Sequence, residues 1–109
     1  MSYNKLVRDN IPRIMEEKGQ IPNIRKLNDT EYKEELEKKL YEEYQEVLDS
    51  NCSSRIEELA DMVEVINYLA ILEGESLDKV IEVAKKKKEE RGGFDKKIYL
   101  MGVKNESVE

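Results

Sequence analysis

The chain of 109 residues has the length of one small domain, residues 1–109, with a core thin enough to benefit from association with a second copy. Its formal charge of −6 argues against a nucleic-acid polymer as partner, because such binding needs a positive surface that displaces counterions. With no His and a single Cys, the composition excludes His-ligated zinc, Cys–His catalysis and an internal disulfide.

No apolar run approaches the ~20 residues of a membrane span, and the N-terminus lacks an apolar signal core. We therefore expect a cytoplasmic protein with no membrane partner. Few Gly and Pro residues and many charged side chains favour helices over a β-sandwich.

Capping signals predict the first two helices. Asp9 and Asn10 can cap a short helix that ends near Gly19, with a Pro early enough to be tolerated in the first turn. A long, heavily charged helix should follow, starting from a cap at Asp29 or Thr30 and reaching about residue 49.

The same signals predict two further helices. Ser54 and Glu57 have the S-x-x-E spacing of a capping box, which should start a third helix that ends near Gly74. Ser76 can cap a fourth, which should stop at Gly92. The lone Cys52 falls in the turn before the third helix and is read as a tolerated loop residue.

The segment "FDKKIYLMGV", residues 94–103, alternates apolar and polar side chains and predicts a short strand, for which residues 2–7 are a possible pairing partner. The predicted fold is therefore all-α, an antiparallel bundle of about four helices with a short C-terminal strand, completed by oligomerisation.

Acidic residues intrude on the apolar stripe of the second helix. At ~100° per residue, Glu43 falls inside this stripe and Glu46 stands at its edge. Glu42 lies further toward solvent. The stripe consists of Leu36, Leu40, Tyr44 and Val47.

The third helix is apolar almost all the way round, which predicts a central, buried element. Glu58 and Asp61 share a second apolar face on the side opposite its main stripe. That main stripe consists of Ile56, Val63, Ile66 and Ala70. A short turn would make the two helices antiparallel neighbours and bring both acidic pairs together.

Four carboxylates at an apolar interface would repel one another and lose hydration, at a cost of several kcal/mol per buried ion, unless a cation compensates. All-oxygen ligation suits Mg²⁺, or Mn²⁺ as a substitute. The alternative is that the acids are solvated surface, which is the common fate of Glu-x-x-Glu in a charged helix. Two such pairs on consecutive apolar faces favour the metal site.

The residues "EEYQEV" and "ELAD" resemble the E-E-x-x-E…E-x-x-D signature of the MazG-like, all-α nucleoside triphosphate pyrophosphatases. "YNKLVRDNIP" and "RGGFDKKIYL" are similar to the ends of a compact house-cleaning branch, which is phosphoribosyl-ATP pyrophosphohydrolase-like. The likeness covers nearly the whole chain. It departs at Asn10, where the motif often has Lys.

The resemblance implies Mg²⁺-dependent hydrolysis between the α and β phosphates, which yields a nucleoside monophosphate and pyrophosphate. It implies metal ligation by Glu43, Glu46, Glu58 and Asp61. Glu42 matches the first acid of the motif, as a more distant ligand or as a base that orients water. The catalytic candidates are thus Glu42, Glu43 and Glu46, since a nearby carboxylate can take the proton of the attacking water.

Basic residues near both ends of the chain are candidates to bind the substrate phosphates. Arg8 precedes the first helix, and Lys87 and Arg91 share a face of the fourth at i, i+4. Lys5 is the remaining candidate. For the lysine run at 85–88, a solvated helix end is an equally good interpretation.

Two alternatives to a house-cleaning enzyme remain open. The scaffold could process a dedicated nucleotide such as phosphoribosyl-ATP or dUTP, or it could be a non-catalytic helical oligomerisation module. In the enzymatic interpretation we expect a homodimer or a dimer of dimers, in which subunits bury the faces that one chain leaves uncovered.

Overall fold

The computed structural model describes residues 4–49 and 54–104. Within these ranges the chain forms four helices and no strand, which confirms the all-α class. None of the helices described is long and apolar enough to cross a membrane. Cys52 and the turn around it lie outside the described residues.

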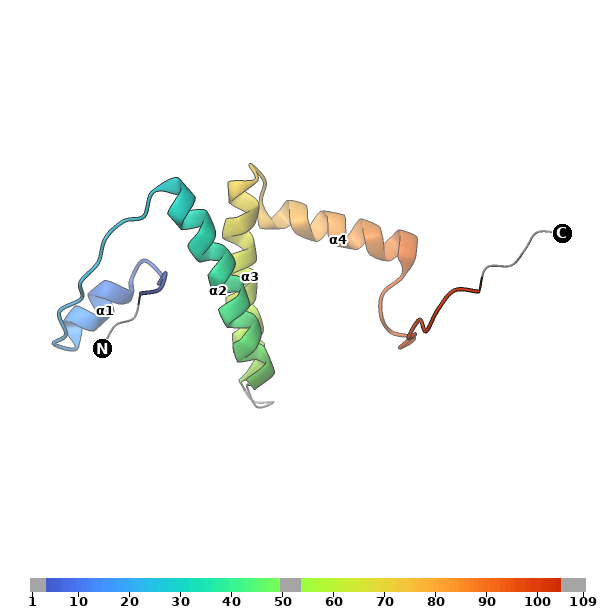
Figure 1. Cartoon of the computed structure of the whole chain (residues 1–109), viewed down its shortest axis with the longest axis horizontal. Coiled ribbons are helices and arrows are strands. Elements are labelled where there is room, and N and C mark those ends of the chain that lie inside the picture. The colour runs from blue at the N-terminus through green and yellow to red at the C-terminus, as the bar shows by residue number, and fades with distance from the viewer. Residues whose placement is uncertain (1–3, 50–53, 105–109) are drawn as a thin grey trace.

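Helices α2 (Asp29–Asp49) and α3 (Arg55–Leu72) lie side by side as an antiparallel hairpin (Figure 1). The hairpin holds the core. Leu36 and Val47 of α2 and Val65 of α3 are buried, whereas no described side chain is completely enclosed. The single chain therefore has a core one helix pair thick.

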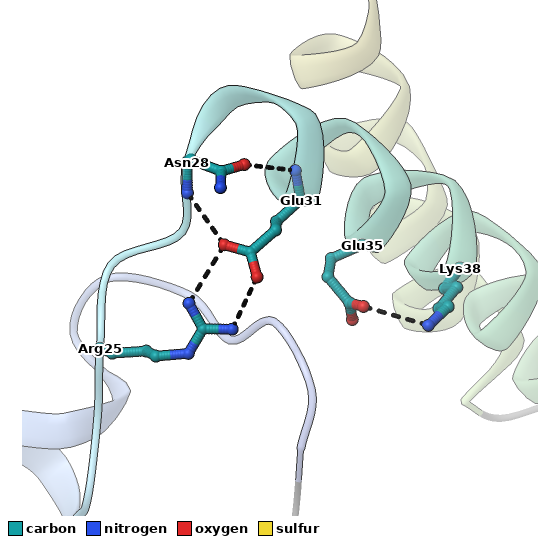
Figure 2. Close-up of polar contacts among 5 residues, drawn as sticks. All are labelled: Arg25, Asn28, Glu31, Glu35 and Lys38. Carbon is teal, nitrogen blue, oxygen red and sulfur yellow. Dashed lines mark hydrogen bonds and ion pairs between the residues drawn. The ribbon is translucent and has the colours of Figure 1, made fainter.

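The start of α2 is fixed by reciprocal hydrogen bonds (Figure 2). The Glu31 backbone N–H donates to Asn28 Oδ1 at 2.9 Å, and the Asn28 backbone N–H donates to Glu31 Oε1 at 3.2 Å. This is a capping box with Asn28 as the cap, one residue before the predicted caps. Arg25 adds two hydrogen bonds to the Glu31 carboxylate, at 2.8 and 3.1 Å, and so ties the preceding loop to the helix.

The short helix α1 (Ile11–Glu17) forms where the sequence predicts it, with Pro in its first turn and Asn10 in the N-cap position. The Asn10 side chain makes no capping hydrogen bond. After α1, Gly19 has a φ of +84°, a conformation that favours glycine, and an extended loop leads to α2. Within the described ranges, α1 packs against none of the other helices (Figure 1).

The third and fourth helices are joined by a tight turn. Backbone N–H groups of Glu73 and Glu75 donate to the Ala70 carbonyl, and Gly74 adopts a φ of +78°. Ser76 then caps α4 (Leu77–Arg91), because its Oγ accepts a hydrogen bond from the Lys79 N–H at 3.2 Å. Ser54 occupies the N-cap position of α3 without making the predicted side-chain capping bond. The turn directs α4 away from the hairpin (Figure 1).

The predicted C-terminal strand is wrong for this chain. Residues 94–103 form no strand, and neither do residues 4–7 of the suggested partner. The segment continues outward from α4, with Phe94 98% and Met101 91% exposed. Alternation gives a segment the right faces for a sheet, but a strand also needs a neighbour for its N–H and C=O groups, and no described segment is paired with it.

Candidate metal centre

Three carboxylates converge where α2 faces α3. Glu43, Glu58 and Asp61 each place one oxygen so that the three atoms lie within 4.8 Å of one another. Glu43 is buried, with 7% of its surface exposed, while Glu58 and Asp61 are half-buried. The cluster thus joins the middle of α2 to the first two turns of α3.

Helical spacing puts these residues together. Glu43 lies four residues before Val47 and seven after Leu36, so it shares the buried side of α2 with both. Glu58 and Asp61 are three residues apart and project from one side of α3, the side that Val65 continues. The buried side of each helix therefore carries acids among its apolar residues.

The electrostatics of the cluster disfavour three ionised carboxylates. Burial raises the pKa of Glu43, and the nearby charges of Asp61, Glu46 and Glu42 raise it further, against the opposing effect of Lys39. The pKa of Glu58 is also raised, by burial and then by the charges of Glu46 and Asp61. The positive charges beside the cluster, Arg8 at Asp61 and Lys39 at Glu43, leave Glu58 without an ion pair among the described residues.

An unsatisfied oxygen shows that the residues fit a cation. Oε2 of Glu58 is buried and has no hydrogen-bond partner among the described residues. Buried polar atoms are normally paired, so an orphaned carboxylate oxygen beside two other carboxylates calls for a positively charged ligand. Oxygen-only donors match hard divalent ions. The cluster of Glu43, Glu58 and Asp61 could therefore hold a metal ion.

Arg8 reaches this cluster from the segment before α1. Its Nη2 donates to Asp61 Oδ1 at 2.7 Å, and its Nη1 lies 3.7 Å from Glu64 Oε2. Arg8 is a predicted phosphate-binding residue, whereas Glu64, one turn after Asp61 on the same helix, is not among the predicted site residues. The i, i+3 spacing of two acids was the available signal for a guanidinium that bridges both.

Lys39 lies on the α2 side of the cluster. Its Nζ lies 3.4 Å from Glu42 Oε1 and 3.6 Å from Glu43 Oε1. The Lys39 side chain is only 20% exposed. One lysine thus partly balances the buried Glu43 charge, and Glu42 stands beside the cluster rather than within it.

Glu46, predicted as a fourth ligand, is exposed and does not belong to the group of converging oxygens. It lines an open groove of about 350 Å³ together with Asp49, Ser54 and Glu58. Because Glu58 belongs to both the groove and the cluster, the groove gives solvent and small solutes a route to the acids.

The predicted phosphate-binding residues do not all meet. Arg8 touches Asp61, and Lys5 lies exposed on the same N-terminal segment. Lys87 and Arg91 are exposed in the last turns of α4, which points away from the hairpin (Figure 1), and the structure does not bring them to the acidic cluster of their own chain.

Comparison of the chain with protein-family models, curated proteins and solved structures finds no match.

Proposed function

We propose that the chain is a divalent-cation-dependent nucleotide pyrophosphohydrolase of the MazG-like class, which cleaves a nucleoside triphosphate between the α and β phosphates. The observation that carries the proposal is the convergence of Glu43, Glu58 and Asp61 with a buried, unpaired carboxylate oxygen. Non-canonical nucleotides are the substrates that the sequence resemblance favours. The working unit would be an assembly of at least two copies.

Glu43, Glu58 and Asp61 would hold the ion, and Mg²⁺ or Mn²⁺ fits their oxygen donors. A bound divalent ion would supply charge neutralisation for the phosphates and a more acidic water. In the net reaction, water adds to the α phosphorus, the bond to the bridging oxygen breaks, and pyrophosphate leaves.

The chain's own groups support this chemistry in two ways. Glu42 and Glu46 are carboxylates outside the converging set, and in this proposal one of them would accept a proton from the attacking water. Arg8 carries a planar guanidinium suited to a phosphate, and it already lies at the cluster through Asp61. Phosphoryl transfer needs mainly positioning and charge neutralisation, so the absence of His is no obstacle.

The test is pyrophosphate release from a panel of canonical and damaged nucleoside triphosphates, with phosphoribosyl-ATP and dUTP included, in Mg²⁺, Mn²⁺ or EDTA. We expect metal-dependent release that is lost in Glu43→Gln and in Asp61→Asn. Glu37→Gln, an exposed acid elsewhere on α2, is the matched control and should behave as the native chain.

Release of pyrophosphate that EDTA leaves unchanged would overturn the proposal. So would no release from any nucleotide by a chain that calorimetry shows to bind Mg²⁺ or Mn²⁺. In that second case the non-catalytic oligomerisation module would become the better interpretation.

A further inference from the structure

The Arg8 guanidinium bridges two carboxylates of α3 that differ in their relation to the candidate metal centre. Its Nη2 lies 2.7 Å from Asp61 Oδ1, and its Nη1 lies 3.7 Å from Glu64 Oε2. Asp61 contributes to the group of converging oxygens, whereas Glu64 does not. Because the two acids are three residues apart on one helix, their side chains project from the same face. Arg8 therefore has one nitrogen at a candidate metal ligand and the other near an acid outside the centre.

These two contacts should respond differently to a divalent cation. Without an ion, Asp61 is the stronger partner of Arg8, because it accepts a short hydrogen bond and the Glu64 contact is longer than a hydrogen bond. A cation at the cluster would neutralise Asp61 and repel the guanidinium, since like charges repel at short range. Glu64 lies outside the converging group and would keep its charge. It would then become the stronger partner of Arg8.

Among the described residues, the Arg8 side chain has no third ionic partner. Within residues 4–49 and 54–104, Asp61 and Glu64 are the only acids at ion-pair distance from it. The backbone adds little restraint, because Arg8 directly precedes the segment of α1, which packs against none of the other described helices. With Asp61 neutralised, Glu64 is the described acid that opposes departure of the guanidinium from α3.

A simple charge effect of Glu64 and a positioning role predict opposite results. Glu64 is negative and lies near a guanidinium that the proposed function assigns to a phosphate. Its charge alone repels a phosphate, so its removal should tighten phosphate binding. If Glu64 instead keeps Arg8 in place, its removal frees a long side chain whose ordering costs entropy, and phosphate binding should weaken. The sign of the change in affinity separates the two roles.

We propose that Glu64 is a positioning residue, which holds the Arg8 guanidinium beside the candidate metal centre once a divalent cation neutralises Asp61. Glu64 acts through Arg8 and touches no phosphate itself. The planar guanidinium has five N–H donors, so it can keep one edge on Glu64 while another N–H reaches a phosphate oxygen. This inference rests on the proposed function, because it takes the cation and the phosphate from there.

The first experiment is a double-mutant cycle on the affinity for inorganic pyrophosphate in Mg²⁺, measured by calorimetry. It compares the native chain, Glu64→Gln, Arg8→Gln and the double variant. In the native background we expect Glu64→Gln to weaken pyrophosphate binding by up to about fivefold, the range for an exposed ion pair. In the Arg8→Gln background the same change should cause no loss of affinity, because no guanidinium is left to position.

Glu57→Gln is the matched control for the cycle. Glu57 is an exposed acid of α3, four residues before Asp61, whereas Glu64 follows Asp61 by three. Both changes remove one negative charge from the same helix near the cluster, but Glu57 makes no ion pair with Arg8. Glu57→Gln should therefore bind pyrophosphate at least as tightly as the native chain. Circular dichroism checks that all variants keep their helices.

A second experiment observes Arg8 without pyrophosphate or nucleotide. The NMR signals of the Arg8 guanidinium are assigned by their loss in Arg8→Gln. In EDTA, rotation of the guanidinium should be restricted in both the native chain and Glu64→Gln, because Asp61 holds it in each. In saturating Mg²⁺ the restriction should persist in the native chain and disappear in Glu64→Gln.

An unchanged or tighter affinity for pyrophosphate in Glu64→Gln would overturn the proposal. So would an equal loss in both Arg8 backgrounds, a native chain that does not bind pyrophosphate in Mg²⁺, or a native Arg8 that rotates freely once Mg²⁺ is bound. If both experiments succeed and no nucleotide is hydrolysed, the proposed function fails and the role of Glu64 stands. A chain that binds no Mg²⁺ in calorimetry would overturn both.

Discussion

Nη2 of Arg8 lies 2.7 Å from Oδ1 of Asp61, one of the three carboxylates that form the candidate metal centre. The two residues are 53 positions apart in the sequence, Arg8 in the segment before α1 and Asp61 in α3. A guanidinium and a metal ion both neutralise Asp61, so the two compete for the same charge. Metal binding is therefore expected to weaken the hold of Asp61 on Arg8 and to leave the guanidinium available for a phosphate.

Arg8→Gln should increase metal affinity. The ion pair is more than two-fifths exposed on both sides, and exposed pairs contribute about 0.2–1 kcal/mol, so the dissociation constant should fall by up to about fivefold. Calorimetric titration with Mn²⁺ measures this. Arg13→Gln, a change at an exposed arginine of α1, is the control. An affinity that is unchanged or lower in Arg8→Gln would show that Arg8 does not compete with the ion.

Glu43→Gln should stabilise the metal-free protein. Burial and like charges raise the pKa of Glu43, which means that its ionised form is disfavoured in the folded state. Replacing a buried charge by a neutral amide of the same shape should raise the free energy of unfolding in EDTA by about 1 kcal/mol, or Tm by about 4–8 °C.

In saturating Mn²⁺ the native chain should be more stable than Glu43→Gln, because the native chain gains binding energy that the variant lacks. Thermal unfolding with and without metal measures both effects, with Glu37→Gln as the control. A variant that is less stable than the native chain in EDTA would mean that the Lys39 ion pair outweighs the burial of the carboxylate.

Glu46→Gln should weaken metal binding less than Glu43→Gln does. Glu46 is exposed beside the groove, whereas the converging oxygens belong to Glu43, Glu58 and Asp61. Mn²⁺ titrations of the two variants at the same pH give the comparison. Equal losses would place Glu46 in the coordination sphere, as the sequence pattern predicts, beside Glu58 with which it lines the groove.

The Arg25–Glu31 contact predicts a loss of stability in acid. Hydrogen bonds from Arg25 and from the Asn28 backbone lower the pKa of Glu31 from 4.5 to about 2. A carboxyl whose pKa is depressed by folding contributes stability above its unfolded pKa, and this is lost as the pH falls from about 4.5 toward 2. The contact is exposed, so solvent screens it and the effect is modest.

Urea unfolding in EDTA between pH 5 and pH 2 is the measurement. Glu31→Gln should be less stable than the native chain at pH 5 and should approach it at pH 2. Glu34 is an exposed acid in the same turn of α2, and the stability of Glu34→Gln should change with pH as that of the native chain does. If the stability of Glu31→Gln also changes with pH as that of the native chain does, the contact makes no difference to folding.

Local sequence rules predict most of the helical framework and the buried acid. The positions of Ser76 and Gly92 predict both ends of α4, and the spacing from Leu36 to Val47 predicts the burial of Glu43. They succeed because helix caps and stripes depend on neighbours a few residues away. The α2 cap is displaced to Asn28 because several adjacent residues are equally good caps, and only the reciprocal bond with Glu31 distinguishes them.

Contacts between distant segments lie beyond these rules. Nothing near Arg8 identifies Asp61 as its partner, because the contact depends on how the N-terminal segment crosses the hairpin. The alternation in residues 94–103 suits a strand, but it does not supply a second strand within the chain. The basic residues of α4 can be read from the sequence in the same way. The direction of α4 cannot, because it depends on the turn at Gly74 between α3 and α4.

That turn makes the direction of α4 depend on one residue. Gly74 has a φ of +78°, and a Cβ built there meets no atom within 4 Å, so only backbone strain resists substitution. An alanine at this position would favour continued helical geometry, which would tend to join α3 and α4 into one straight rod. Helix α4 would then continue along the axis of α3 rather than leave the hairpin. A single methyl group would thereby change where the basic residues of α4 lie relative to the acidic hairpin.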